Sequence, residues 1–204
     1  TIEHRITTNE SLIYKLEESA RTIYRKMFVE GIDLDNLPEG WHKGTFGEVA
    51  TISSGKTITD KHDVPTGDYI YPVAGASGII GYTRNYNQVE QFLTTGRVGT
   101  IGVVNKYKGK SWTADNVLVV KSSYYEFSYQ VLKALRYEDI MKGGVQSLIT
   151  QTDLRDAPIV VPSKDILNAF ESEAKTFDSA IDLMKKENNL LSNASLLLLE
   201  RMSY

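Results

Sequence analysis

Apolar residues recur at alternating steps of four and three at both ends of the chain, which is the spacing of a coiled-coil seam. Two long amphipathic helices are therefore expected, over residues 1–30 and 163–204, with a separate domain over residues 31–162 between them. The N-terminal seam consists of Ile2, Ile6, Asn9, Ile13, Leu16, Ala20, Ile23 and Met27. The C-terminal seam consists of Leu167, Phe170, Ala174, Phe177, Ile181, Met184, Asn188, Leu191, Ser195, Leu198 and Met202.

Capping and helix-breaking residues indicate where these helices begin and end. Gly31 and Pro38 mark the end of the first helix, and Ser163 is a good N-cap for the second. Thr7 and Glu10 fit a capping box, so without a partner the first helix is expected to be ordered only from about residue 8. The second helix would be about 57 Å long, which favours packing against a partner or another part of the chain over packing on its own domain alone.

The two arms also resemble each other at a constant offset of 179 residues. At this offset Ile2 falls on Ile181, and Asn9 falls on Asn188. The polar seam position is Asn in both arms, a residue that lowers coiled-coil stability but fixes register and partner. The arms are consistent with copies of one repeat, although heptads resemble other heptads by their period alone.

Between the arms, residues 41–162 contain 13 of the 15 glycines and several short stretches of strand composition. Strands are expected near Ile79–Ile80, Thr100–Val104, Asn116–Val120 and Ala157–Val161, and a short helix over Phe127–Tyr137. The expected fold class is α+β, with a globular β-rich domain flanked by N- and C-terminal coiled-coil helices.

The net charge of −3 conceals an uneven distribution along the chain. Residues 41–162 carry 13 Lys and Arg against 11 Asp and Glu, so the acidic excess lies in the arms. Between residues 84 and 110 five basic residues face one acidic residue, Glu90. Local basic surface, not total charge, governs affinity for phosphate, so this segment is either a binding face or an ordinary solvated one.

Several classes of chemistry lack their usual residues. The sequence has no cysteine and only three scattered histidines, so a structural metal site is not expected. It has no adjacent prolines for a methyltransferase motif, and Gly96, Gly99 and Gly102 are better explained as hairpin glycines than as a nucleotide loop. No apolar run is long enough to span a membrane, and no cofactor is expected. We therefore expect a non-catalytic cytoplasmic protein.

The middle domain offers polar and basic loops of the kind that read DNA bases without doing chemistry on them. Each loop could equally be a surface turn with ordinary polar residues, and aromatic bulk at Tyr82 and Tyr86 could belong to the core. The candidate DNA-binding residues are Lys56, Ser77, Arg84, Asn85, Asn87, Arg97, Lys106, Lys108, Gln146 and Ser147.

Motifs along nearly the whole chain resemble Type I restriction-modification specificity subunits. The opening of a target-recognition domain resembles Pro38–Trp41 followed by Gly47–Val49 and Ile52–Lys56. Thr95–Gly102 and Ala114–Asn116 are similar to the internal segments of such domains, and Gly144–Ile149 with Pro158 to their closing segment. The arms resemble the spacer helices of the family. Each motif is loose, but their order and spacing make the resemblance specific.

The resemblance implies a half-length subunit with one target-recognition domain, or a fragment of a longer subunit with two. It implies partners: double-stranded DNA, methyltransferase (modification) subunits, a restriction subunit in some systems, and a second copy in a homodimer. The residues expected on the oligomer or partner helices are Ile13, Leu16, Ile23, Phe177, Ile181, Asn188, Leu191 and Leu198.

Three functional classes remain open on the sequence. The favoured one is a subunit that reads one half of a bipartite DNA target and docks methyltransferase subunits. The alternatives are a coiled-coil assembly or regulatory protein that binds such partners without reading DNA, and an enzyme acting alone. Base choice depends on loop geometry and DNA shape, so the sequence does not give the target.

Overall fold

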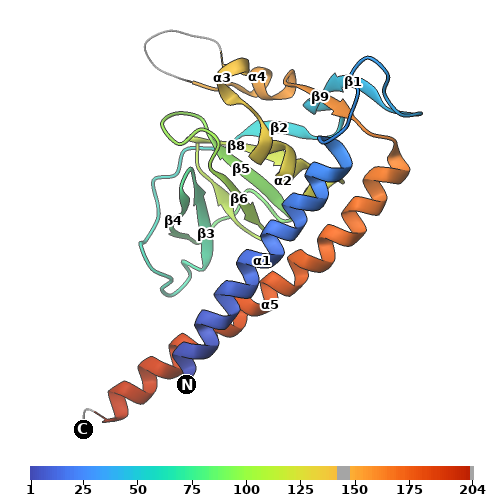
Figure 1. The fold of residues 1–204 in the computed structure, drawn as a ribbon. Coiled ribbons are helices and arrows are strands. Elements are labelled where there is room, and N and C mark those ends of the chain that lie inside the picture. The colour runs from blue at the N-terminus through green and yellow to red at the C-terminus, as the bar shows by residue number, and fades with distance from the viewer. Residues whose placement is uncertain (142–147, 203–204) are drawn as a thin grey trace. The chain divides into compact units, whose positions relative to one another are not determined.

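A computed structural model of the chain describes residues 1–141 and 148–202. The chain forms two compact units, one from Thr1–Ile32 with the residues from Asn168 onward, and one from Asp33–Leu167. In chain order, a strand-rich domain lies between a long N-terminal helix and a long C-terminal helix (Figure 1). The α+β class expected from the sequence is confirmed.

The helices α1 (Ile2–Phe28) and α5 (Lys164–Met202) run antiparallel beside each other (Figure 1). Near one end of the pair the ring of Phe170 contacts Tyr24 and Phe28, with centroids 6.1 and 5.2 Å apart. The long C-terminal helix therefore packs along the other arm, one of the possibilities open from its length. The seam residues Ala20, Phe170, Ala174 and Ile181 are buried, as the four-three spacing predicts.

A start near residue 8 was expected only for a first helix without a partner, and here α5 lies beside its first turns. Helix α1 begins at Ile2, and the Thr1 hydroxyl oxygen accepts a hydrogen bond from the His4 backbone N at 3.3 Å. The Thr7 hydroxyl instead donates to the Glu3 carbonyl inside the helix. The first turns are supported by α5, which supplies the partner that the isolated helix would lack.

The centre of the Asp33–Leu167 unit is a four-stranded antiparallel sheet. Every residue of β5 and nearly every residue of β8 is buried, so both faces of this sheet are covered. On one face Phe92 stacks on Tyr107, and both pack in a cluster with Ala74 and Ala76. The strand order is β2 (Thr51–Ser54), β8 (Val117–Lys121), β5 (Phe92–Gly96) and β6 (Val104–Tyr107).

Two smaller sheets and a few short helices complete this unit. In the three-stranded sheet β3 lies between an antiparallel neighbour, β4, and a parallel neighbour, β7. The two-stranded sheet pairs β1 with β9. Their bounds are β3 (Tyr71–Gly75), β4 (Gly78–Thr83), β7 (Trp112–Thr113), β1 (His42–Thr45) and β9 (Pro158–Val161). The helical segments are η1 (Phe46–Glu48), α2 (Tyr125–Ala134), α3 (Tyr137–Ile140) and α4 (Gln151–Arg155).

Most of the expected strands and the expected short helix are present within a few residues. The exception is the strand expected over Thr100–Val104, of which only Val104 lies in a strand. The Val103 backbone N donates to the Thr100 carbonyl at 3.2 Å, and Gly102 has a φ of +83°. These residues form the turn between β5 and β6, so the nearby glycines are hairpin glycines.

Ile181 provides a test of the helix pair. Ile181→Asp places a charge at a position that is 7% exposed, and we expect the free energy of unfolding to fall by about 3 kcal/mol. Leu183→Asp, two residues away and 68% exposed, should change it by less than about 0.5 kcal/mol. Urea unfolding followed by circular dichroism measures both. Equal losses in the two variants would contradict the proposed seam.

Candidate nucleic-acid interface

Residues 113–116 connect β7 to β8 and hold the loops that carry several candidate residues. The Lys56 backbone N donates to the Thr113 carbonyl at 2.8 Å, which fixes the β2–β3 loop on this segment. At Gly55 an added Cβ would lie 1.8 Å from the Ala114 carbonyl oxygen, so only glycine permits the approach. The backbone of Lys56 is thus held in place while its side chain is exposed.

Asn87 binds the β4–β5 loop to the same segment. Its amide oxygen accepts hydrogen bonds from the Thr113 backbone N at 2.9 Å and from the Thr113 hydroxyl at 3.1 Å. Its amide nitrogen donates to the Thr113 carbonyl at 3.3 Å. The neighbouring Gln88 side chain also donates to the Thr113 hydroxyl. The side chain of Asn87 therefore holds a loop in place, and it is only partly exposed.

Arg97 follows β5 directly. Because β5 pairs with β8, Arg97 lies beside the residues that precede β8. Its backbone N donates to the Asn116 carbonyl at 3.2 Å, and its Nη1 lies 3.5 Å from the Asp115 carbonyl oxygen. Its Nε is buried without a hydrogen-bond partner in the part of the chain that the structure describes. A buried N–H without a partner costs free energy, so this side chain is not held in place by hydrogen bonds at all of its nitrogens.

Gln146 and Ser147 lie outside the described residues. The residue that follows them, Leu148, forms a bridge with Val98, and the Ile149 backbone N donates to the Arg97 carbonyl at 3.1 Å. Lys56, Asn87 and Arg97 are therefore brought together around residues 113–116, and the described end of the Gln146 segment adjoins Arg97.

Arg84 is held at the end of β4 by an aromatic ring and a carboxylate. Its guanidinium carbon lies 4.4 Å from the ring centroid of Tyr69, and Nη2 also donates to the Tyr69 hydroxyl oxygen. That hydroxyl donates to Asp60 at 2.6 Å, and Arg84 Nε is 3.5 Å from the same carboxylate. Hydrogen bonding to Tyr69 raises the pKa of Arg84. The Arg84 guanidinium is held by Tyr69, and the Asp60 carboxylate offsets part of its charge.

Lys106 is directed toward helix α2. Its Nζ lies 2.6 Å from the Glu126 carboxylate and 4.4 Å from the ring centroid of Tyr129. The side chains of Lys106 and Glu126 are 24% and 5% exposed. The lysine neutralises a buried carboxylate, and its removal would take away an opposite charge that favours the ionised form.

The remaining candidates are exposed but scattered. Ser77 lies in the β3–β4 turn, at the opposite end of that hairpin from Arg84. Asn85 and Lys108 lie in the β4–β5 and β6–β7 loops, and their side chains are exposed. The structure does not bring Ser77 together with the residues around 113–116 through any hydrogen bond within the described ranges.

The sequence did not single out an aromatic cluster beside these loops. The rings of Tyr71 and Tyr86 meet edge to face at 5.1 Å, and Lys110 lies over both. Tyr86 is 42% exposed, so it is a surface residue and not part of the core. No alternating strand pattern predicts this cluster, because Tyr71 is the first residue of β3 and Tyr86 lies in the loop after β4.

The expected partner-helix residues lie on α1 and α5. Ile181 is buried, several others are half-buried along the seam, and Leu198 is 53% exposed. The half-buried residues are Ile13, Leu16, Ile23, Phe177, Asn188 and Leu191. Asn188 contacts Asn9 within this chain, so part of the expected partner surface is used by the chain's own helix pair.

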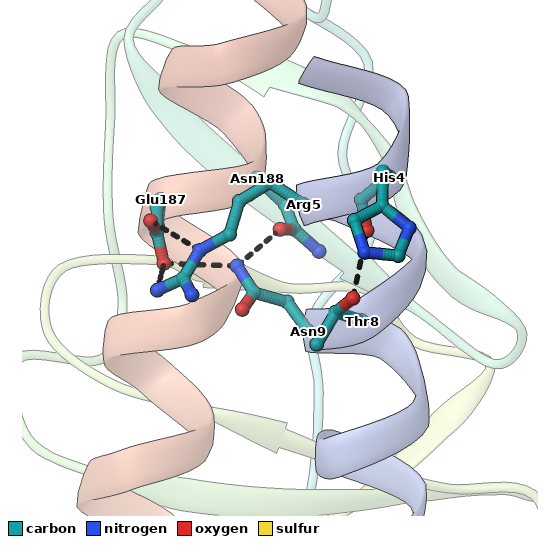
Figure 2. Close-up of polar contacts among 6 residues, drawn as sticks. All are labelled: His4, Arg5, Thr8, Asn9, Glu187 and Asn188. Carbon is teal, nitrogen blue, oxygen red and sulfur yellow. Dashed lines mark hydrogen bonds and ion pairs between the residues drawn. The ribbon is translucent and has the colours of Figure 1, made fainter. Parts of the chain in front are cut away.

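A polar cluster crosses the helix pair at this point (Figure 2). The Asn9 amide nitrogen donates to Asn188 Oδ1 at 2.8 Å and to Glu187 at 2.9 Å. Arg5 binds the same carboxylate through two nitrogens, at 2.9 and 3.1 Å. Hydrogen bonds from Arg5 and Asn9 lower the pKa of Glu187, so their stabilisation is present above the ordinary carboxylate pKa and is lost as the pH falls.

Two buried tyrosines of the strand-rich domain have raised pKa values. Burial raises the pKa of Tyr107 and of Tyr137 to about 12, which keeps both hydroxyls neutral at physiological pH. Across residues 1–141 and 148–202, no three His, Asp or Glu side chains gather as metal ligands would. The arrangement presents polar loops on a rigid sheet, as binding domains do.

Comparisons with known proteins identify the class of protein to which this domain and its two flanking helices belong. The family profile described as Type I restriction modification DNA specificity domain matches residues 38–193. The chain belongs to this family, and the resemblance found in its sequence is confirmed.

Individual relatives are similar to the chain over part of their own length. Over 131 residues it is 26% identical to the Escherichia coli Type I restriction enzyme EcoprrI specificity subunit, covering 61% of this chain and 32% of that subunit. Its fold is similar to the M. genitalium Type-I restriction-modification S subunit, with a TM-score of 0.73 at 18% identity. A second similar fold is the HsdS subunit from Thermoanaerobacter tengcongensis, with a TM-score of 0.52 at 13% identity. The alignments cover 97% and 96% of this chain but 56% and 52% of those chains.

Asn87 and Asn85 form a matched pair for testing how the loop is held. We expect Asn87→Ala to lower the free energy of unfolding by about 2 kcal/mol, because it leaves buried groups of Thr113 unpaired. Asn85→Ala should change it by less than about 0.5 kcal/mol, because that side chain is exposed. Denaturant titration of the two purified variants distinguishes the effects. A stable Asn87→Ala protein would show that the loop is held by its backbone alone.

Proposed function

We propose that this chain is the sequence-reading part of a Type I restriction-modification system and reads one half of a bipartite DNA target without methylating or cutting it. The observation that carries the proposal is the family match over residues 38–193, which spans the whole strand-rich domain and most of α5. The convergence of the Lys56, Asn87 and Arg97 loops on residues 113–116 supports the same role. Phosphate and base contacts of this kind need exposed polar loops on a rigid support.

In this proposal the helices set the distance between recognition domains and dock methyltransferase subunits, with a restriction subunit in some assemblies. Helix α5 has 39 residues against 27 in α1, and its apolar residues Leu196–Leu199 are each more than half exposed. Exposed leucines in a row favour contact with another protein surface. A second copy of this chain would relate two identical domains by a two-fold axis and select an interrupted palindrome.

The proposed place of action is the cytoplasm, where the DNA of such a system lies. In the described ranges, none of the helices is both long and apolar enough to cross a lipid bilayer. No cofactor is required by the proposed role, because chemistry on the DNA belongs to the methyltransferase and restriction subunits.

The experiment that tests this function has two arms. In the first, the solution mass of the chain is measured alone and with the methyltransferase subunit of its own system. In the second, the resulting complex selects DNA from a random duplex pool that is then sequenced. Enrichment of one bipartite sequence supports the proposal. Duplex binding without enrichment would instead favour a coiled-coil assembly protein that occupies methyltransferase partners.

Arg97 is the residue whose loss should affect sequence reading most clearly. We expect Arg97→Ala to weaken binding of the selected sequence by about tenfold, as for loss of one base contact. Oligomerisation should not change, because Arg97 lies outside the helix pair. Arg136→Ala is the control, since Arg136 is exposed and paired with Glu138 and Asp139. Fluorescence anisotropy with the selected duplex measures both, and unchanged affinity in Arg97→Ala would remove Arg97 from the interface.

A further inference from the structure

The β4–β5 and β6–β7 loops are joined by backbone hydrogen bonds. Asn87 N and Gln88 N donate to the Ser111 carbonyl at 3.1 and 3.0 Å, and Ser111 N donates to the Gln88 carbonyl at 3.2 Å. The Asn87 side chain adds a hydrogen bond from the β4–β5 loop to Thr113 of β7. Residues that flank this junction are therefore held next to each other. Tyr86 lies on one side of it and Lys110 on the other.

Lys110 is held by aromatic rings. Its Nζ lies 4.7 Å from the ring centroid of Tyr86 and 5.9 Å from that of Tyr71. The two rings contact each other at an interplanar angle of 71°, which gives the ammonium a shaped aromatic support. Lys110 is itself exposed. Contact with the rings restricts a side chain that would otherwise sample many conformations in water.

Within residues 1–141 and 148–202, the charge of Lys110 has no partner of opposite sign. No carboxylate of the described residues lies within ion-pair distance of its ammonium, whereas Arg84 has Asp60 and Lys106 has Glu126. Within the basic segment 84–110, those two cations are already used inside the domain. Lys110 is therefore restricted in position, exposed to solvent, and without an ion-pair partner among the described residues. An external anion can bind a side chain with these properties.

We propose that Lys110, positioned by Tyr71 and Tyr86, binds a phosphate of the DNA backbone and sets the register of the recognition loops. The inference rests on the proposed function, and it adds one specific backbone contact to it. A lysine ammonium is a point charge that suits phosphate, while base edges are better matched by the planar groups of Arg, Asn and Gln. The same junction contains Asn87, and the Asn87 side chain binds Thr113, whose carbonyl also accepts from Lys56 N.

The dependence of affinity on salt concentration tests this contact, because each neutralised phosphate adds about 0.9 to the slope of log K against log salt. The full chain is titrated against a 30-base-pair duplex of arbitrary sequence between 50 and 200 mM KCl by fluorescence anisotropy. We expect Lys110→Ala to reduce the slope by about 0.9 and the affinity at 100 mM by about fivefold to tenfold. Lys110→Arg should keep the wild-type slope, since it keeps the charge.

Two further variants separate charge from position. Lys133→Ala removes another exposed lysine, on α2, and should leave slope and affinity unchanged. Tyr86→Leu removes one ring from the support and should lower affinity by about twofold to threefold with little change of slope. Thermal unfolding of each variant checks that the fold is intact.

The outcomes distinguish this inference from the function on which it rests. A wild-type slope in a folded Lys110→Ala protein that binds DNA would overturn the phosphate contact and leave the DNA-reading function standing. If Lys110→Ala lost binding to the methyltransferase subunit instead, the surface would be a protein contact and the inference would be wrong. A wild-type chain that binds no duplex at any salt concentration, either alone or with the methyltransferase subunit, would contradict the proposed function itself.

Discussion

One short segment, residues 113–116, holds three of the candidate DNA-binding residues together: Lys56, Asn87 and Arg97. Thr113 accepts from Lys56 N, and its carbonyl, hydroxyl and backbone N all bind Asn87. Its strand, β7, is only two residues long and is paired in parallel with β3. A strand this short has little stability of its own. The position of β7 therefore depends on the Lys56 and Asn87 loops, and the position of these loops depends on β7.

Partner choice inside the domain decides which basic residues remain for DNA. Arg84 and Lys106 belong to the basic segment noted in the sequence, yet each lies against a carboxylate of its own domain. Lys110 lies against tyrosine rings instead. Charge counts along a sequence do not separate these cases, because the carboxylates come from residues 60 and 126, far from the segment in the chain.

The sequence predicted the helices and most strands because their patterns are local. A seam that keeps one period over eleven positions leaves few alternatives to a long helix, and strand composition at Asn116–Val120 matches a strand buried on both faces. It missed the turn at Thr100–Val103 because the β-branched residues there resemble a strand, and Gly102 overrides them. It missed the position of Lys110 for a different reason: the Tyr71 ring comes from β3 and the Tyr86 ring from the β4–β5 loop, and only the folded chain brings them together.

The role of Asn87 was also beyond a local sequence pattern. An asparagine in a polar loop suits base recognition, but its three hydrogen bonds to Thr113 are long-range contacts that no local pattern contains. Arg97 differs, because its place among the glycines of residues 96–102 was evident from the sequence, although the buried strand β5 before it was not predicted. Its buried Nε, by contrast, is known only from the structure.

The hydrogen bond between Asn9 and Asn188 joins residues 179 positions apart, and this is also the offset at which the two helices resemble each other. In an antiparallel pair, equivalent positions can meet only at a centre of local two-fold symmetry. At this point each helix presents the same residue type to the other. Exchange of one helix between two chains would form the same helix–helix contacts again, at almost no cost in contact energy. Closed and exchanged forms should then differ mainly in entropy, so protein concentration becomes the variable that selects between them.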